Sequence, residues 1–264
     1  MYSDEHKVYL YKIKANRILV RFTQIIIMVL FLIIWQILAD KNIINSFISS
    51  SPKEVFKTII RLHKSNNLYH HIFITVYETL ISFLSSTMIG IIVAAILWWN
   101  KFLSKVFDPY LTILNSLPKV ALGPIIIIWA GAGMKSIIIM ALLISTIITI
   151  QTVYQAFTEV NINKLKLMKS FSATKRQTFF KLILPSSYSS IISSLKINIS
   201  MSLVGVIMGE FLVSKSGLGY LIMYGSQVFN LNLVVTGIFI LAIVASFMYY
   251  GILFIERKFK KNKR

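Results

Sequence analysis

The sequence predicts an all-α membrane protein with about six transmembrane helices. Only 14% of its 264 residues are charged and 56% are hydrophobic, whereas a soluble globular domain carries about 25% charged residues. The apolar residues also gather in runs of about 20, the length that crosses the core of a bilayer as a helix. Together these two observations indicate a chain with most of its length embedded in lipid.

The net charge of +19 is typical of nucleic-acid-binding proteins as well as of membrane proteins, and the placement of the charges decides between them. Lysines and arginines fall between the apolar runs and at both ends of the chain, which is the pattern that orients a membrane protein. We therefore expect the lipid bilayer, and no nucleic acid, as the partner of these charges.

No metal site is expected. The chain contains no cysteine, which excludes disulfides and cysteine-ligated zinc or iron–sulfur sites. His63, His70 and His71 lie close in sequence, but adjacent histidines on one helix point in different directions and no carboxylate-rich set accompanies them. The sequence therefore predicts histidines at the membrane interface rather than metal ligands.

The expected elements follow from the apolar runs taken in order. The first run could belong to a secretory signal, but it is long for one and further spans follow, so we expect a retained helix. The third run contains Pro118 and Pro124, which must kink or break it. Trp98 and Trp99 suit the membrane interface at the end of the second run, and a short loop with Lys101 and Lys105 is expected after them. The six predicted spans cover about residues 22–39, 71–99, 108–130, 136–155, 188–213 and 231–255.

Three units are expected along the chain. Residues 1–69 hold a basic cytoplasmic start, the first span and an external amphipathic segment, in which Ser51 and Pro52 predict a helix start. Residues 70–255 form the transmembrane core, and residues 256–264 form a basic tail. Six spans place both termini on one side. Because the start, the tail and the polar insert 161–185 hold most of the positive charge, we expect that side to be the cytoplasm.

The insert 161–185 is the longest polar stretch between two apolar runs. Ile162, Leu165 and Met168 recur at three-residue spacing and predict one short helix. Thr174 and Gln177 form a capping box that predicts the start of a second. Two interpretations fit this pattern: a basic amphipathic loop on anionic headgroups, or a helix pair that docks into a groove of another protein.

The insert resembles the coupling loop, or EAA loop, of permease subunits of bacterial ABC importers. In that family an acidic-Ala-Ala triplet is followed by a glycine four residues after its last alanine, then by an apolar stretch that ends in Leu-Pro. Leu184 and Pro185 stand at the family spacing, while residues 166–168 (Lys-Leu-Met) replace the triplet and Ser172 replaces the glycine. The resemblance favours the docking interpretation of the insert.

Further stretches resemble the nitrate/sulfonate/taurine branch of these permeases, and the likeness runs from about residue 50 to the C-terminus. They are Asp108-Pro109, the segment 117–124 (LPKVALGP) followed by Trp129, the segment 209–212 (GEFL) and the segment 217–222 (GLGYLI). The resemblance implies a type I importer permease in a bacterial cell membrane, with a solute pathway for a small organic anion of the sulfonate, taurine or nitrate type. It also implies a second permease copy, two cytoplasmic ABC ATPase subunits and an extracytoplasmic solute-binding protein.

The chain itself is not expected to be an enzyme or to bind a cofactor. It contains no phosphate loop of the G-x-x-x-x-G-K-[ST] type, because Met134 separates Gly133 from Lys135 in the one similar stretch. ATP is therefore expected on a separate subunit. Three alternatives remain open: an importer of an aromatic vitamin precursor of the thiamine-pyrimidine or riboflavin type, an ion-coupled carrier working alone, and a membrane-embedded lipid enzyme. The last would need acidic or histidine clusters that the nine dispersed acidic residues do not form.

Two sets of candidate site residues follow. The coupling loop supplies the predicted ATPase contact: Lys166, Met168, Phe171, Ser172, Ala173, Lys175, Phe179 and Pro185. Polar groups in or beside the spans supply the candidate pathway: Asn115, Ser116, Pro118, Ser145, Thr149, Asn198, Ser202 and Glu210.

The pathway residues have a second interpretation as hydrogen-bond partners between helices, and Glu210 as a cap of the outer loop. Glu78, Lys119 and Lys196 are the other charges within spans, and they are functional candidates because charges are costly there. Lys196 lies close enough to the cytoplasmic end to reach the interface with its long side chain.

Overall fold

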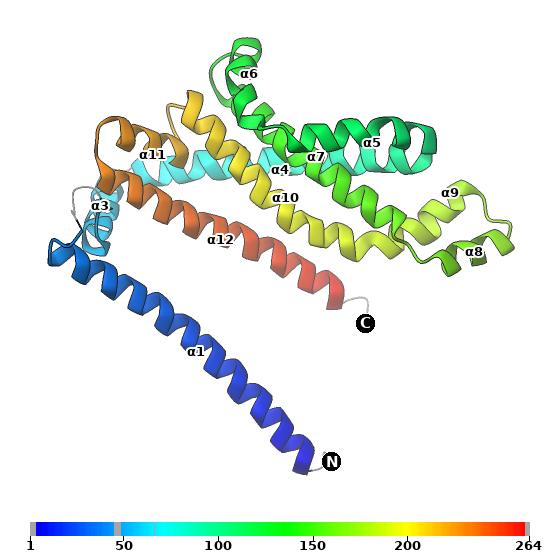
Figure 1. The fold of residues 1–264 in the computed structure, drawn as a ribbon, viewed down its shortest axis with the longest axis horizontal. Coiled ribbons are helices and arrows are strands. Elements are labelled where there is room, and N and C mark those ends of the chain that lie inside the picture. The colour runs from blue at the N-terminus through cyan, green and yellow to red at the C-terminus, as the bar shows by residue number, and fades with distance from the viewer. Residues whose placement is uncertain (1–3, 45–48, 66, 262–264) are drawn as a thin grey trace.

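The computed structural model describes residues 4–44, 49–65 and 67–261, and every regular element in these ranges is helical (Figure 1). This agrees with the all-α prediction. The elements are α1 (Asp4–Asp40), α3 (Pro52–Lys64), α4 (Asn67–Trp99), α5 (Lys101–Ser116), η1 (Lys119–Leu122), α6 (Gly123–Ala130), α7 (Met134–Thr158), α8 (Ile162–Ser170), α9 (Lys175–Thr178), η2 (Phe179–Ile183), α10 (Leu184–Val213), α11 (Leu218–Gln227) and α12 (Leu231–Lys261).

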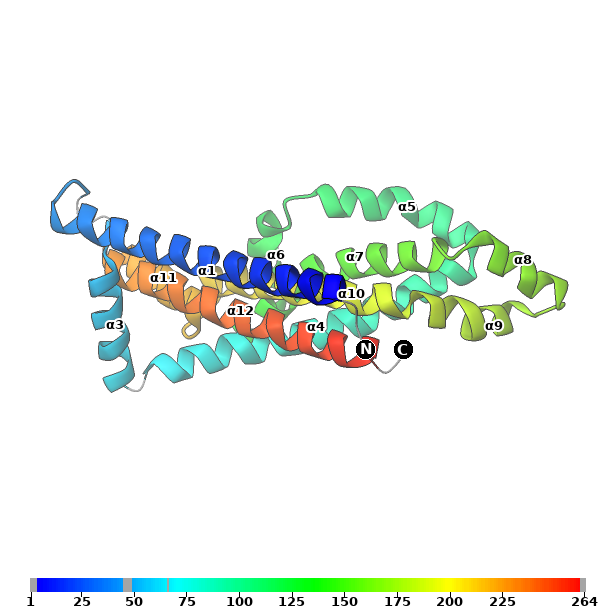
Figure 2. The same cartoon turned by 90° about the horizontal axis from the view of Figure 1, so that it is seen from below.

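The long helices α4, α7, α10 and α12 run along the long axis of the molecule. Both views place α8 and α9 at one end of this bundle and α3 and α11 at the other (Figures 1 and 2). Within the described residues, five helical stretches are long and apolar enough to cross a membrane, and a bent pair raises the number to six. The predicted number of spans is therefore confirmed.

The bent pair is the predicted third span. Helix α5 ends at Ser116, and the stretch from Lys119 to Ala130 leaves it at 88°. Leu117 has an extended backbone, with φ −66° and ψ 139°, which is the conformation that a following proline favours. Pro118 therefore breaks the span, as expected.

The loop predicted at Lys101 is wrong, because helix α5 already begins there. The side chain of Asn100 accepts hydrogen bonds from the backbone N–H groups of Phe102 and Leu103 at 3.0 and 3.2 Å. An asparagine cap satisfies two of the free donors at a helix start. The chain thus reverses direction within one residue, between the end of α4 and the start of α5.

The core lies where α4, α7 and α10 approach one another through small residues. A Cβ atom on Gly205 of α10 would lie 2.5 Å from the Cα of Ala141 on α7, and one on Gly209 would lie 2.9 Å from the Cα of Ile137. This glycine spacing permits direct backbone contact, as is common between membrane helices. On the other side of α7, Gly90 of α4 leaves equivalent room for Thr149.

The two ends of the chain differ in how they meet the bundle. Helix α1 diverges from the other helices (Figure 1), and none of its most apolar window is buried. Near the C-terminal end of α1, the side chain of Gln36 accepts a hydrogen bond from the backbone N–H of Lys53 at 3.0 Å, beside the predicted cap Ser51 of α3. At the other end, α12 continues through the predicted tail to Lys261, and residues 262–264 lie outside the described ranges.

Candidate functional site

The coupling segment, residues 161–185, folds into the two short helices that the sequence predicts. Asn161 caps α8 by accepting from the N–H of Asn163 at 2.8 Å. The capping box of α9 closes in both directions: Thr174 accepts from the N–H of Gln177 at 3.2 Å, and Gln177 accepts from the N–H of Thr174 at 2.8 Å. Local capping therefore sets both helix starts.

The turn between the two helices is a Schellman motif with Ser172 at its left-handed position. Ser172 has a φ of +50°, its N–H donates to the carbonyl of Lys169, and the N–H of Ala173 donates to the carbonyl of Met168. Glycine usually occupies this position because it adopts positive φ without steric cost. The structure thus explains why the resembled loops carry glycine where this chain carries serine.

The predicted contact residues divide by exposure. Phe171, at the turn, is 73% exposed, which is unusual for an aromatic side chain outside lipid. Met168 and Ala173 are half-buried. The remaining exposed members of the predicted set are Lys166, Ser172, Lys175 and Pro185.

Phe179 is the exception, since the structure places it in the interior with 5% exposure. Its ring centroid lies 4.9 Å from that of Trp98, 5.2 Å from that of Trp99 and 5.5 Å from that of Phe157. We call these four residues the aromatic cluster. The expectation of a surface contact is corrected here, because the side chain lies behind the exposed face and joins it to the ends of α4 and α7.

Lys175 makes polar contacts with the two tryptophans of the aromatic cluster. Its ammonium group donates to the carbonyl of Trp99 and lies 6.0 Å from the ring centroid of Trp98. A cation at this distance over an indole ring is attracted to it. The first turn of α9 is therefore held against the end of α4 by both a hydrogen bond and a ring contact.

Pro185 lies inside a continuous helix. A single helical stretch runs from Lys175 to Val213, and Phe179–Ile183 within it form a turn of π-helix. Proline lacks an N–H and its ring crowds the carbonyl four residues earlier, so a widened turn just before it relieves both. At 1.5 Å per residue the 39 residues span about 58 Å, nearly twice the core of a bilayer. The N-terminal part of this helix therefore projects beyond the lipid.

The candidate pathway residues also divide. Asn115, Ser116 and Pro118 are exposed at the break between α5 and η1. The other five are buried: Ser145, Thr149, Asn198, Ser202 and Glu210.

Asn198 shows why the buried members lie where they do. Its Nδ2 donates to the hydroxyl of Thr87 at 2.6 Å, and its Oδ1 accepts from the hydroxyl of Ser86 at 3.2 Å. Both partners belong to α4. Asn198 is thus a hydrogen-bond link between α10 and α4, the second of the two roles open for it.

Glu210 lies on α10, and its side chain caps the start of a different helix, α11. Its carboxylate accepts from the N–H of Gly219 at 2.5 Å and from the hydroxyl of Thr75 at 2.6 Å. The same hydroxyl accepts from the N–H of Leu218 at 2.8 Å, and Nδ1 of His71 accepts from the N–H of Gly217 at 2.9 Å. Side chains from α4 and α10 therefore satisfy three successive donors at the start of α11.

The two glycines of this segment are required by the approach of Glu210. Gly217 has a φ of +112°, and a Cβ atom there would overlap the Glu210 carboxyl group. A Cβ on Gly219 would lie 2.8 Å from the Cβ of Glu210. Only glycine lets the carboxylate reach the start of α11.

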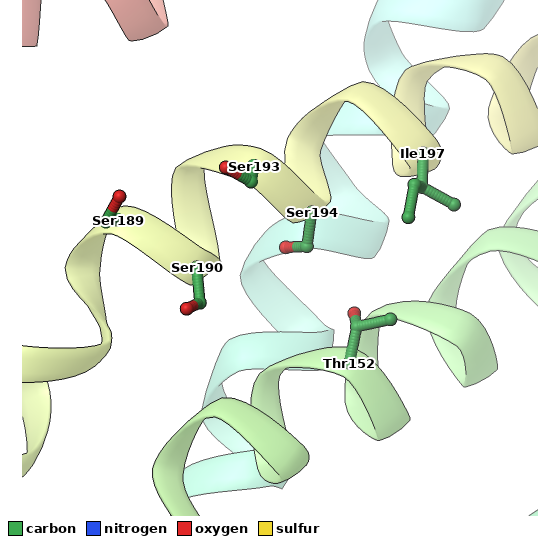
Figure 3. A pocket seen from close by; sticks show the side chains of 6 residues that line it. All are labelled: Thr152, Ser189, Ser190, Ser193, Ser194 and Ile197. Carbon is green, nitrogen blue, oxygen red and sulfur yellow. The ribbon is translucent and has the colours of Figure 1, made fainter. Parts of the chain in front are cut away.

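A groove lined by hydroxyl groups lies between α7 and α10. Its volume is about 290 Å³, and Figure 3 shows Ser190 and Ser194 of α10 turned toward α7, which carries Thr152, while Ser189 points away from it. A second groove of about 240 Å³ shares Ser190 and extends to Asn161 and Lys164 of the coupling segment. Sequence reasoning missed these residues, although six serines within residues 186–194 of one span are a signal. The first groove is lined by Thr152, Ser189, Ser190, Ser193, Ser194 and Ile197.

One ion pair joins α10 to α12 beside this groove. The ammonium of Lys196 lies 2.9 Å from a carboxylate oxygen of Glu256, whose other oxygen accepts from Ser193 at 3.0 Å. Lys196 therefore has a protein partner instead of reaching the interface alone, and the predicted tail contributes a buried carboxylate. Among the described residues no group of three or more potential metal ligands occurs.

Comparisons with known proteins agree with this arrangement. Residues 86–261 match the family described as the binding-protein-dependent transport system inner membrane component. The chain is 25% identical over 228 residues to the putative aliphatic sulfonates transport permease protein SsuC of Bacillus subtilis, covering 86% of this chain and 83% of SsuC. It is 29% identical over 190 residues to the formylaminopyrimidine transport permease protein ThiX of Halalkalibacterium halodurans, covering 72% and 75%.

A solved structure shares the fold. The inward-facing MetNI methionine ABC transporter contains a chain that superposes with a TM-score of 0.65 at 20% identity, covering 72% of this chain and 95% of that one. This likeness supports the permease-like helical architecture that the sequence predicts.

Proposed function

Since the chain belongs to the family of binding-protein-dependent transport system inner membrane components, we propose that it forms the solute pathway of an ABC importer and is driven through the coupling segment. Its place as a permease subunit of such an importer follows from the family. The observation that carries the coupling role is the exposed Phe171 on a capped turn, in a segment whose second helix is anchored by the buried Phe179. An exposed aromatic on a rigid support suits a groove on another protein.

The partner for this surface is a separate cytoplasmic ABC ATPase, one copy for each of two permease copies. Lys166, Phe171 and Ser172 would contact it, while the aromatic cluster passes its movement to α4 and α7. Rigid-body displacement of packed helices is a common way to transmit such a movement. In this proposal the coupling segment and both termini lie in the cytoplasm, and α3 and α11 lie on the outer side, where a solute-binding protein delivers its ligand.

We propose a small organic anion of the sulfonate type as the solute. The likeness to a sulfonate permease supports this choice. The hydroxyl-lined groove also suits it, since the hydroxyl groups of Ser189 and Ser190 can donate to the oxygens of a sulfonate. The second candidate is a pyrimidine vitamin precursor, which the likeness to ThiX favours and which the same hydroxyl groups can bind.

Transport by the reconstituted complex tests the proposal. The chain is co-expressed with an ABC ATPase and a solute-binding protein from the same genome, and proteoliposomes are loaded with ATP on the ATPase side. Uptake of radiolabelled taurine or an aliphatic sulfonate that needs ATP and binding protein is the expected result. Uptake of formylaminopyrimidine instead would replace the solute but keep the class.

Two outcomes would overturn the proposal. Uptake driven by an ion gradient without ATP or an ATPase subunit would indicate a carrier that works alone. Turnover of a lipid substrate by the purified single chain would indicate a membrane enzyme.

A further inference from the structure

Two carboxyl groups meet in the outer half of the bundle, where the importer role requires neither. Glu78 of α4 is 2% exposed and Glu210 of α10 is 1% exposed, and the two carboxyl groups adjoin each other. Two ionised carboxylates that adjoin each other away from water repel strongly, so such a pair needs a proton on one member. We propose that Glu78 and Glu210 form a proton-binding site that holds one proton, and that Glu78 carries it.

The partners of Glu210 assign the negative charge to it. Its oxygens accept from the hydroxyl of Thr75 at 2.6 Å and from the backbone N–H of Gly219 at 2.5 Å. This N–H group belongs to the first turn of α11, whose helix dipole places partial positive charge at that end. A carboxylate with two donors at a helix start is stabilised in its ionised form.

The surroundings of Glu78 assign the proton to it. Its Oε2 atom is buried and has no hydrogen-bond partner. The hydroxyl oxygen of Ser82, one turn further along α4, is also buried without a partner. An ionised carboxylate with an unpartnered buried oxygen is costly, whereas a neutral acid leaves only a carbonyl oxygen unpaired. Within the described residues neither carboxyl group forms an ion pair with a lysine or arginine.

The bound proton has a structural role that goes beyond the proposed transport function. The proton removes the repulsion between the two buried carboxylates. Glu210 of α10 can then face the start of α11 while Glu78 of α4 lies against it. The proton thus joins α4, α10 and α11 at one point. Glu78 acts through Glu210 and is a positioning residue in this site.

Isosteric amide substitutions distinguish the two carboxyl groups. In Glu78→Gln the amide N–H donates to Glu210 as the protonated acid does, so the detergent-solubilised importer complex is expected to melt within about 2 °C of the parent. In Glu210→Gln an amide group faces two donors with only one acceptor oxygen, so the melting temperature is expected to fall by about 5 °C or more. Equal losses in both variants, or loss in Glu78→Gln alone, would overturn the assignment.

Infrared spectroscopy provides a second readout that needs only the parent and Glu78→Gln complexes. At neutral pH the parent is expected to show the carbonyl-stretch band of a protonated carboxylic acid, and Glu78→Gln is expected to lack it. A band that persists in Glu78→Gln, or no such band in the parent, contradicts the proposal. Neither measurement depends on uptake, so a failure here is distinct from a failure of the proposed transport function.

Discussion

The ring of Phe179 packs against that of Trp98 with centroids 4.9 Å apart, and this contact connects the coupling segment to the end of α4. Trp98 belongs to α4 and Phe179 to η2, two elements that begin more than a hundred positions apart in the chain. Phe157 of α7 closes the other side of Phe179. The second helix of the coupling segment is therefore anchored to two long helices, while Phe171 lies exposed at the turn before it. This arrangement assigns docking to Phe171 and transmission to Phe179.

Truncation of the exposed aromatic should weaken ATPase binding. Phe171→Ala removes a side chain that is 73% exposed at the proposed contact, and the loss of such an anchor typically costs about 2 kcal/mol, or roughly thirtyfold in affinity. Co-purification of the ATPase with the tagged permease measures it. Phe247→Ala of α12, where the side chain is 75% exposed, is the matched control and should leave the yield unchanged. Normal stoichiometry with Phe171→Ala would refute the docking surface.

Truncation of the buried aromatic should affect transmission more than docking. Phe179→Ala leaves a cavity inside the aromatic cluster and should lower the stability of the complex by about 3–5 kcal/mol. We expect the ATPase still to co-purify, with fewer solute molecules transported per ATP hydrolysed. Phe180→Ala, at 52% exposure beside it, serves as the control with a smaller effect. Loss of co-purification equal to that of Phe171→Ala would contradict the separation of the two roles.

The left-handed turn predicts opposite effects of two substitutions at one position. Ser172→Gly should raise stability by about 0.5–1 kcal/mol, because glycine adopts the φ of +50° without strain. Ser172→Val should lower it, because a β-branched residue tolerates this conformation poorly. Thermal melting of the purified complex measures both changes. A Ser172→Gly variant less stable than the parent would contradict the observed turn.

Close contact between α10 and α7 makes Gly205 sensitive to a single added methyl group. Gly205→Ala would place its Cβ 2.5 Å from the Cα of Ala141, a backbone atom that cannot move aside, and should cost about 1–3 kcal/mol. Gly251→Ala is the matched control, because nothing lies within 4 Å of the added Cβ on α12. Comparison of the two melting temperatures tests the packing. Equal behaviour of both variants would mean that the two helices do not touch there.

Filling the hydroxyl-lined groove should slow uptake without affecting ATPase binding. Ser190 borders both grooves, so Ser190→Leu replaces a donor with a bulky apolar group and should reduce sulfonate uptake about tenfold. Ser200→Leu, on the same helix and outside both grooves, controls for the substitution itself. Initial uptake rates in proteoliposomes measure the effect. Equal rates in the two variants would place the solute elsewhere.

Short-range patterns were enough to predict much of the fold. The capping signals at Ser51 and Thr174 each lie within one helical turn of the group that they cap, so the printed sequence already contains both partners. The spans follow from local hydrophobicity, and Pro118 breaks its span through its own geometry and that of Leu117. The prediction failed at Lys101 because a lysine within a helix start cannot be distinguished by charge from one in a loop.

The amino-acid sequence by itself determined the membrane class, the number of spans and the two-helix coupling segment, because each depends on residues that are neighbours in the chain. Only the tertiary structure decided which side of that segment is exposed, placing Phe171 outside and Phe179 inside the aromatic cluster. It also decided that Glu210 caps α11 together with Thr75, a residue 135 positions earlier. Such contacts depend on how distant helices pack, and no local pattern encodes which polar side chains will meet.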